Sequence, residues 1–257
     1  PGSYDPSTYV MGIRRPLARY QLRRRRAEVL QDLPPKVSSE LVLDLGQKQR
    51  STYQVAEREG IVRLRSLGRE LRISHVLELI LRLKQICNFC PETDTSAKFT
   101  DLQERLSTII AAGERALVFS QFAQEPFGVL RLARELKAFS PFVLTGDMDL
   151  GTRMATVREF QEKADSRPMI LSLKAGGVGL TLTAASYVFH FDRWWNPAIE
   201  AQAEDRAYRI GQDKPVHVYS YLTADTVEER IARILSEKRS LFSDIIDDEP
   251  ARALEGL

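Results

Sequence analysis

The run ALVFS at residues 116–120 opens a series of five short apolar segments that decides the fold of this chain. The other four are PFVLT at 141–145, MILSL at 169–173, YVFHF at 187–191 and VHVYSYL at 216–222. Stretches with helical periodicity separate them, at 98–112, 124–138, 149–163 and 197–210. Continuous apolar strands that alternate with helices are typical of a parallel sheet covered on both faces. The sequence therefore predicts an α/β fold.

The parts of the chain on either side of this series have mainly helical patterns. Residues 11–95 show such a pattern, interrupted by an alternating run at 36–43, and the apolar stripe at 75–88 is its clearest segment. After residue 225, Thr226 and Glu229 have the spacing of a capping box, which predicts a helix start. We expect the apolar face of this closing helix to pack on the N-terminal helical region, or to dock on a domain outside this chain.

These patterns divide the chain into three parts: a helical region and linker at 1–97, the α/β domain at 98–225, and the closing helix with its tail at 226–257. The 257 residues, 43% of them hydrophobic, are enough to bury a sizeable core. The opening Pro-Gly-Ser, without an initiator Met, is typical of an excised fragment. The sequence shows no membrane-spanning apolar run and no signal peptide. We therefore expect an intracellular protein without a membrane partner, in the bacterial cytoplasm or nucleoid or in a eukaryotic nucleus.

The net charge of +2 hides an uneven distribution. Seven arginines lie between residues 14 and 26, whereas acidic residues gather near the C-terminus. Such a basic run either attracts nucleic acid or forms a solvated helix face. Cys87 and Cys90 form a single CxxC pair, and the three histidines lack ligand spacing. The sequence therefore predicts buried structural thiols and no metal site.

Polar and glycine-rich loops follow four of the predicted strands. These loops are 120–122, 145–147, 172–179 and 192–197. Because the carboxyl ends of parallel strands share one edge of a sheet, we expect the loops to meet where such folds bind ligands. Hydroxyl groups, glycine amides and a lysine suit phosphate, and an exposed tryptophan can stack on a base. The plainer alternatives are that a glycine-rich loop is only a turn and that Trp194 belongs to the core.

The segment AQAEDRAYRIGQ at 201–212 adds two arginines to this picture. Spacings of four and three residues place Gln202, Arg206 and Arg209 on one face of the predicted helix 197–210, which starts with Asn196 as N-cap and Pro197 at its first position. Two guanidinium groups on a rigid helix suit a multiply charged oxyanion, such as a transferring phosphoryl group. The alternative is a solvated face on which the arginines pair with nearby carboxylates.

Five segments resemble the C-terminal motor-lobe motifs of the Swi/Snf-type ATPases, which are double-stranded-DNA translocases of helicase superfamily two. They are ALVFSQF (116–122), VLTGDM (143–148), ILSLKAGGVGLTLTAAS (170–186), FDRWWNP (191–197) and QAEDRAYRIGQ (202–212). Residues 33–53 and 80–88 resemble the inter-lobe region of this family, and 226–246 resembles its brace helix. The likeness covers nearly the whole chain. It implies a RecA-like parallel sheet flanked by helices, with an N-terminal helical region and a C-terminal brace helix.

The resemblance also implies roles for particular residues. Arg206 and Arg209 match the arginines that reach across a cleft to the phosphates of ATP, and they are the expected catalytic residues. Gln202 matches a residue that helps to set their helix, and Gly177 and Gly179 match the turn near the nucleotide. The expected contacts with the DNA backbone are Ser120, Gln121, Thr145, Gly146, Ser172, Lys174 and Trp195.

Four positions depart from the family pattern, in which threonine, arginine, asparagine and histidine are usual: Leu173, Lys174, Thr181 and Tyr208. The first two affect the expected phosphate contacts, and Thr181 affects a sugar contact to the nucleotide. The phosphate loop G-x-x-x-x-G-K-[ST] and the magnesium motif Asp-Glu-x-His are both absent from the sequence. Because phosphoryl transfer needs a phosphate cradle and a metal ion as well as arginines, we expect this fragment to bind ATP weakly at best and to hydrolyse none alone.

The resemblance implies that the chain is half of an ATP-dependent double-stranded-DNA translocase or remodeller, which is a DNA-dependent ATPase as the full-length protein. The expected partners are double-stranded DNA, the N-terminal motor lobe of the same protein and a DNA-bound protein target. The expected cofactors are ATP and Mg²⁺, with Mg²⁺ held by the missing lobe. One alternative is a non-catalytic DNA-binding or docking module. Another is a dinucleotide-binding enzyme, but AGGVG (175–179) lacks the G-x-G-x-x-G register and an acidic ribose partner.

Overall fold

The computed structural model describes residues 33–163, 165–173, 175 and 179–247, with side chains as far as residue 237. Residues 33–231 form one compact unit, and the segments 1–32 and 232–257 belong to another. The arginine run at 14–26 and the apolar side chains of the closing helix after residue 237 lie outside the described residues.

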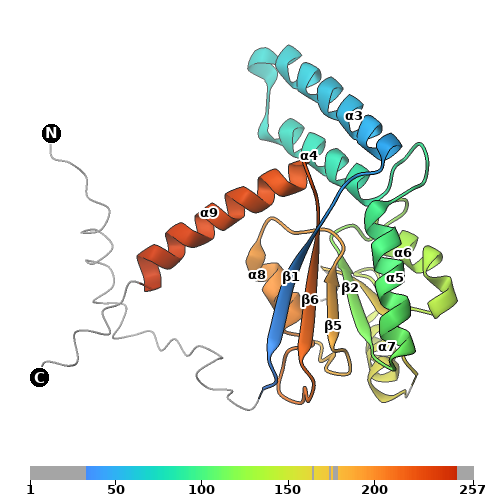
Figure 1. Cartoon of the computed structure of the whole chain (residues 1–257). Coiled ribbons are helices and arrows are strands. Elements are labelled where there is room, and N and C mark those ends of the chain that lie inside the picture. The colour runs from blue at the N-terminus through green and yellow to red at the C-terminus, as the bar shows by residue number, and fades with distance from the viewer. Residues whose placement is uncertain (1–32, 164, 174, 176–178, 248–257) are drawn as a thin grey trace, which may run out of the picture. The chain divides into compact units, whose positions relative to one another are not determined.

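Six parallel strands form the sheet of the compact unit, in the order β1-β6-β5-β2-β4-β3 (Figure 1). Their bounds are Lys36–Leu43 for β1, Ala116–Ser120 for β2, Phe142–Leu144 for β3, Met169–Ser172 for β4, Tyr187–His190 for β5 and Val216–Thr223 for β6. Every residue of β2 and β4 is buried, as expected for strands covered on both faces. The five strands predicted from apolar runs are confirmed to within one residue at each end.

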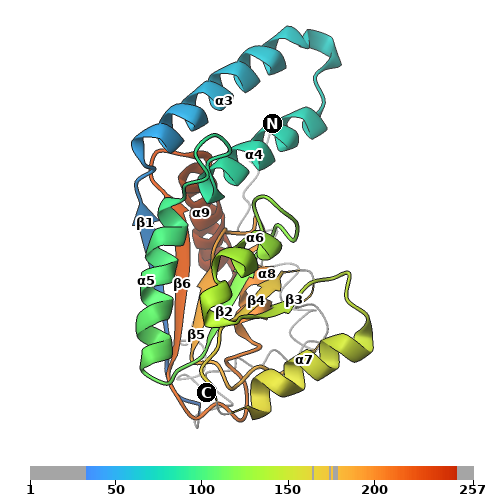
Figure 2. The same cartoon turned by 90° about the vertical axis from the view of Figure 1, so that its right-hand side faces the viewer.

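Helices cover both faces of the sheet. The helices α5 (Ala97–Ala111) and α6 (Val129–Glu135) pack on one face, where Leu102, Leu106 and Leu132 meet Val118 of β2. The helices α7 (Leu150–Glu162) and α8 (Pro197–Glu204) pack on the other face, where their apolar residues meet Leu117. Figure 2 shows α5 running along the sheet. The arrangement confirms the predicted α/β fold.

A helical hairpin stands beyond the carboxyl ends of the strands (Figures 1 and 2). It consists of α3 (Gln47–Ser66), the short 3₁₀ helix η1 (Gly68–Glu70) and α4 (Ile73–Asn88). The start of α9 (Val227–Asp247) packs on the base of this hairpin, because Val227 joins a core cluster with Tyr53 and Leu83. Cys87 and Cys90 are both buried free thiols, as predicted, and burial raises the pKa of Cys87 to about 12.

Two elements differ from the sequence-based expectation. The run 36–43, expected only as an interruption of the helical region, is the edge strand β1, paired with β6 along its whole length. The helix expected at 124–138 is shorter at both ends. It starts at Val129, because Pro126 has no N–H and the Val129 N–H is already bonded to the carbonyl of Phe122 at 2.9 Å. It ends at Glu135 and continues as the 3₁₀ helix η2 (Lys137–Phe139). In the part of the chain that the structure describes, no helix is long and apolar enough to cross a membrane.

Candidate nucleotide and DNA interface at the carboxyl edge

A groove of about 410 Å³ lies at the carboxyl edge of the sheet. Three residues predicted to contact DNA line it from three different strands: Gln121 after β2, Gly146 after β3 and Ser172 at the end of β4. Gln85 of α4 forms part of the wall, together with the loop at 122–127 and Asp147. The structure therefore brings together three predicted residues that are separated by up to 51 positions in the sequence, as the parallel topology predicts.

The side chain of Gln121 is the free polar group of this groove. Neither its amide nitrogen nor its amide oxygen has a hydrogen-bond partner within the described part of the chain, although both atoms are buried. Its main-chain N–H, by contrast, donates to Asp192 Oδ1 at 2.9 Å. A buried amide without partners is costly in free energy, because it has lost its hydration without replacement. The groove wall thus contains a donor and an acceptor that a ligand can satisfy only if the side chain turns outward.

Ser120 lies beneath the groove rather than in it. The residue is fully buried, and its hydroxyl donates to Asp192 Oδ2 at 2.5 Å. Asp192 lies two residues beyond the end of β5 and is itself fully buried. It accepts a third hydrogen bond, from Asn88 Nδ2 of α4 at 2.9 Å. The sequence analysis gave no role to Asp192 or Asn88, and only their position beside the predicted loops could have indicated one.

The tryptophan loop is held by charged groups. Lys84 of α4 donates to the carbonyl of Arg193, and its ammonium lies 5.4 Å from the centre of the Trp195 ring. Glu200, in the first turn of α8, pairs with Arg193 at 3.0 Å and accepts from the N–H of Trp194 at 2.8 Å. The side chain of Trp194 packs against the core, in agreement with the plainer alternative, and Trp195 stays half-buried at the edge.

The remaining predicted positions are less informative. Thr145 is mostly buried, and its N–H approaches the sulfur of Met148 at 3.4 Å. Gly179 has a φ of +24°, in the region that favours glycine, and no atom lies within 4 Å of the position that a Cβ would take there. Lys174 and Gly177 lie outside the described residues.

The helix expected at 197–210 is shorter than the spacing argument required. The helix α8 ends at Glu204, so the expectation that Gln202, Arg206 and Arg209 share one continuous helix face is wrong. The turn 205–211 follows it, in which the carbonyl of Arg206 accepts from Leu182 N at 2.8 Å. That carbonyl is therefore not available to continue the helix. The N-cap prediction is confirmed, because the side chain of Asn196 accepts from the N–H of Ala198.

The two arginines of this turn differ in environment. Arg206 is 7% exposed, and its Nε has no hydrogen-bond partner among the described residues. Burial and the charge of Arg209 lower the pKa of Arg206. Arg209 and Gln202 are exposed. The turn therefore carries one buried and one exposed guanidinium group, whose charges repel each other.

The side chain of Gln212 holds the arginine turn, residues 205–211, in place. Its buried side-chain nitrogen lies within hydrogen-bonding distance of three carbonyl oxygens, those of Thr183, Ala185 and Ala207, at 2.9 to 3.2 Å. The side-chain oxygen Oε1 of Gln212 accepts from the N–H of Lys214 at 3.0 Å. The sequence analysis quoted Gln212 within its motif but gave it no role, because a glutamine side chain offers no local signal of which carbonyls it will reach.

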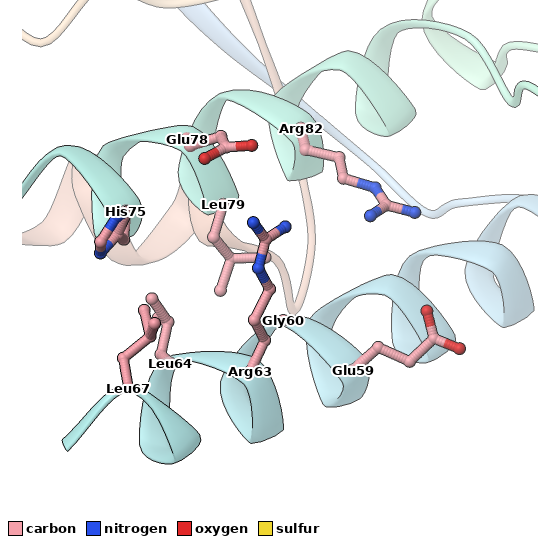
Figure 3. Close-up of a pocket in the computed structure, with 9 residues that line it drawn as sticks. All are labelled: Glu59, Gly60, Arg63, Leu64, Leu67, His75, Glu78, Leu79 and Arg82. Carbon is pink, nitrogen blue, oxygen red and sulfur yellow. The ribbon is translucent and has the colours of Figure 1, made fainter. Parts of the chain in front are cut away.

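A second pocket, of about 170 Å³, lies between α3 and α4 (Figure 3). Charged residues of both helices line it, among them Arg63, Glu78 and Arg82. Figure 3 shows the Arg63 side chain reaching from α3 toward α4, and Leu79 over Gly60. None of the predicted site residues lines this pocket, so we place the candidate site at the carboxyl edge of the sheet.

The fold and this edge define a motor-lobe type of α/β domain, and comparisons with known proteins agree. Residues 76–211 match the helicase conserved C-terminal domain, and residues 7–91 match the SNF2-related domain. The solved SWI2/SNF2 ATPase core of Sulfolobus solfataricus in complex with double-stranded DNA has a TM-score of 0.68 to this chain at 29% identity, covering 92% of this chain and 52% of that one. The chain belongs to the SNF2-type family of helicase superfamily two, and it corresponds to the C-terminal lobe of these proteins.

Two relatives show how much longer such proteins are. The Bacillus subtilis protein YwqA, whose name describes an ATP-dependent helicase/translocase, is 38% identical over 88% of this chain and 26% of its own length. The DNA repair protein RAD5A of Arabidopsis thaliana is 37% identical over 62% of this chain and 15% of its own length. The chain thus spans about a quarter or less of the relatives it matches.

Proposed function

We propose that this chain is the second lobe of an ATP-driven double-stranded-DNA translocase. In this role Arg206 and Arg209 reach the phosphates of an ATP molecule bound on a first lobe, and the groove at the carboxyl edge holds the DNA phosphate backbone. The observation that carries the proposal is the buried, unpartnered Nε of Arg206 beside a second arginine. The family membership of the chain and the DNA-bound structure of its relative support it.

The arginine turn is unfavourable as a purely structural element. A buried guanidinium nitrogen without a partner has lost hydration, and the neighbouring charge of Arg209 adds repulsion. A phosphoryl group placed between the two side chains would supply acceptors and cancel the repulsion. In related phosphoryl-transfer enzymes an arginine of this kind contributes roughly 10³–10⁵ in rate. The arrangement therefore suits catalysis in trans better than it suits stability.

The groove suits a backbone contact that is independent of base sequence. Gln121 contributes an amide, Gly146 a glycine main chain and Ser172 a hydroxyl. All three are uncharged groups that can donate hydrogen bonds to phosphate oxygens. Contacts of this type position a protein on DNA without reading its sequence. DNA binding should therefore tolerate any base sequence. It should also weaken as the salt concentration rises, because the basic residues of the full protein contribute to binding.

The chain supplies only part of the proposed catalytic site. Among the described residues there is no cluster of three or more histidine, cysteine, aspartate or glutamate side chains that could hold a metal ion. We therefore assign the phosphate cradle and Mg²⁺ to the first lobe, and derive no step through a metal bound here. In this scheme residues 98–225 are the motor lobe, to whose sheet the edge strand β1 also belongs; the rest of 1–97 connects the lobe to its partner, and the helix from 226 braces the two.

The decisive experiment measures ATP hydrolysis by the full-length protein, with and without double-stranded DNA. We expect DNA-stimulated turnover that Arg209→Ala lowers by roughly 10³-fold or more. Arg158→Ala, which removes an exposed arginine of α7, is the matched control and should retain turnover. The isolated chain should hydrolyse no ATP.

Two results would contradict the proposal. Near-normal turnover of the Arg209→Ala protein would remove the arginine from catalysis. The absence of turnover in the intact protein, with DNA binding retained, would favour a non-catalytic DNA-binding module.

A further inference from the structure

A chain of buried hydrogen bonds runs directly beneath the groove. It starts at the main-chain N–H of Gln121, which donates to Asp192 Oδ1 at 2.9 Å. The other oxygen of Asp192 accepts from Ser120 Oγ at 2.5 Å and from Asn88 Nδ2 at 2.9 Å. The hydroxyl of Ser120 in turn accepts from the N–H of Phe122 at 3.2 Å. One carboxylate thus holds Ser120 beneath the groove and Gln121 in its wall directly, and Phe122 through the hydroxyl of Ser120.

The series of hydrogen bonds continues away from the groove to the start of α9. Asn88 Oδ1 accepts from Lys98 Nζ at 3.2 Å, and Lys98 pairs with Glu228 Oε1 at 2.6 Å. Glu228 Oε2 accepts from the N–H and the hydroxyl of Thr223, at the end of β6. Lys98 and Glu228 both have fully buried side chains. Side chains from α4, α5 and α9 are therefore linked in series to the carboxylate that holds the groove, with Asn88 of α4 as the direct contact.

The buried charges around these hydrogen bonds are balanced. Lys98, Asp192 and Glu228 belong to the series of bonds, and Lys84 is buried near it and interacts electrostatically with Asp192 and Glu228. The four residues are each no more than 2% exposed, and their formal charges sum to zero. Burying four charged groups costs more desolvation than packing apolar side chains of similar volume would. A purely structural core would reach the same stability with apolar residues. What the charged version adds is a set of directional bonds that fixes one loop.

We propose that Asp192 is the positioning residue of the DNA groove, and that Asn88 holds it in place. By binding the main chain of Gln121 and the hydroxyl of Ser120, Asp192 turns the Gln121 side-chain amide toward the DNA backbone. Ser120 then acts through Asp192 and does not itself contact DNA. This inference rests on the proposed function of the groove, and deepens it by naming the residues that orient the contact.

The test is a double-mutant cycle on DNA affinity in the full-length protein. Asp192→Asn keeps the shape of the side chain but leaves one acceptor oxygen, which cannot serve the Gln121 N–H and the Ser120 and Asn88 donors as the carboxylate does. We expect Asp192→Asn to raise the Kd for double-stranded DNA about tenfold, and Gln121→Ala to raise it by the same factor. The double variant should also have a Kd about tenfold above that of the wild type, because both changes remove the same contact.

A second readout follows the free protein. Hydrogen exchange at the main-chain N–H of Gln121 should accelerate about tenfold in Asp192→Asn, because the oxygen that accepts its hydrogen bond is a weaker acceptor in the amide. The KM for ATP should stay within twofold while the KM for DNA rises, which a general loss of folding would not produce. Asp213→Asn, an exposed carboxylate remote from the groove, is the matched control and should change neither quantity. If Asp192→Asn does not fold, Ser120→Ala takes its place in the same cycle.

The possible outcomes separate this inference from the proposed function. Additive losses of affinity in a protein that binds DNA would overturn the role of Asp192 alone, because the two residues would then act independently. Unchanged affinity of Gln121→Ala would do the same. A wild-type protein that fails to bind double-stranded DNA would overturn the proposed function, and this role with it.

Discussion

The main-chain carbonyl of Arg206 accepts a hydrogen bond from the N–H of Leu182 at 2.8 Å. In a continuing helix this carbonyl would bond to the N–H of Ile210 instead. The bond joins the arginine turn to the segment that follows Gly179, so the two parts expected to face the nucleotide share one main-chain link. The bond is between main-chain atoms, so it does not depend on the identity of either side chain, and only a proline at position 182 would remove its donor.

Arg206 should be important for activity and unimportant for stability. Arg206→Met replaces a buried guanidinium, whose Nε has no partner among the described residues, with an apolar chain of similar length. We expect the free energy of unfolding to stay the same or to rise by about 1 kcal/mol, because an unpaired buried group is removed. ATP turnover of the full-length protein should fall at least about 10³-fold. Urea unfolding and an ATPase assay measure the two effects, and a loss of stability of about 2 kcal/mol would show that Arg206 has a structural role.

The fold was largely predictable because it depends on local patterns. Strands such as 116–120 and 216–222 are continuous apolar runs, and their alternation with helices is enough to indicate the parallel sheet. The membership of β1 was not predictable in this way. Its residues are mostly exposed, and only its pairing with β6 places it in the sheet.

The candidate site was predictable in its components but not in its geometry. Parallel topology places Gln121, Gly146 and Ser172 at one edge, and the structure confirms that they line one groove. The turn after α8 accepts a long-range bond from Leu182, which no local propensity encodes. The role of Asp192 likewise depends on partners 71 to 104 residues away in sequence.

Glu204 should make stability depend on pH in the acidic range. Burial raises the pKa of Glu204, but hydrogen bonds from His190 and Lys36 outweigh burial and lower the pKa from 4.5 to about 2. Because the folded-state pKa is the lower one, the stabilisation is complete above about pH 4.5 and is lost as the pH falls toward 2. The difference corresponds to roughly 3 kcal/mol. Glu204→Gln should therefore cost up to about 3 kcal/mol near pH 6 and little near pH 2.

Urea unfolding of the wild type and of Glu204→Gln at several pH values measures this difference. Glu159→Gln is the control, because Glu159 of α7 pairs with Lys163, just after the helix, through two largely exposed side chains and should contribute at most about 0.5 kcal/mol. A cost of Glu204→Gln that is the same at both ends of the pH range would show that the carboxylate does not stabilise the fold through its charge.

The buried pair of Lys98 and Glu228 should be sensitive to the loss of one partner. Lys98→Met leaves Glu228 buried without its cation, and we expect a loss of about 3–5 kcal/mol in the free energy of unfolding. Lys98→Met combined with Glu228→Gln should recover part of this loss, since no unpaired charge remains. Lys163→Met, at an exposed pair, should cost less than about 1 kcal/mol. Urea unfolding measures these variants, and a double variant that is no more stable than Lys98→Met alone would contradict the expectation.

Gly128 should be required for the shape of the groove loop. A Cβ at this position would lie 2.1 Å from the carbonyl oxygen and 2.4 Å from the carbonyl carbon of Phe122, a residue that lines the groove. These are main-chain atoms, so Gly128→Ala must displace the loop, and the same carbonyl would lose its 2.9 Å bond from Val129 N. We expect a loss of about 2–3 kcal/mol, from overpacking together with a weakened hydrogen bond.

Gly46→Ala is the matched control for this change. Gly46 precedes α3 with a φ of −56°, and a Cβ there would meet no atom within 4 Å. Its cost should stay within about 0.5 kcal/mol. Thermal or urea unfolding measures the stability of both variants. DNA binding by the full-length protein tests the shape of the loop: the affinity should fall in Gly128→Ala and stay unchanged in Gly46→Ala. If Gly128→Ala were as stable as the control but bound DNA weakly, the loop would have moved at no cost to the fold, and the contact of Gly128 with Phe122 would matter for the groove alone.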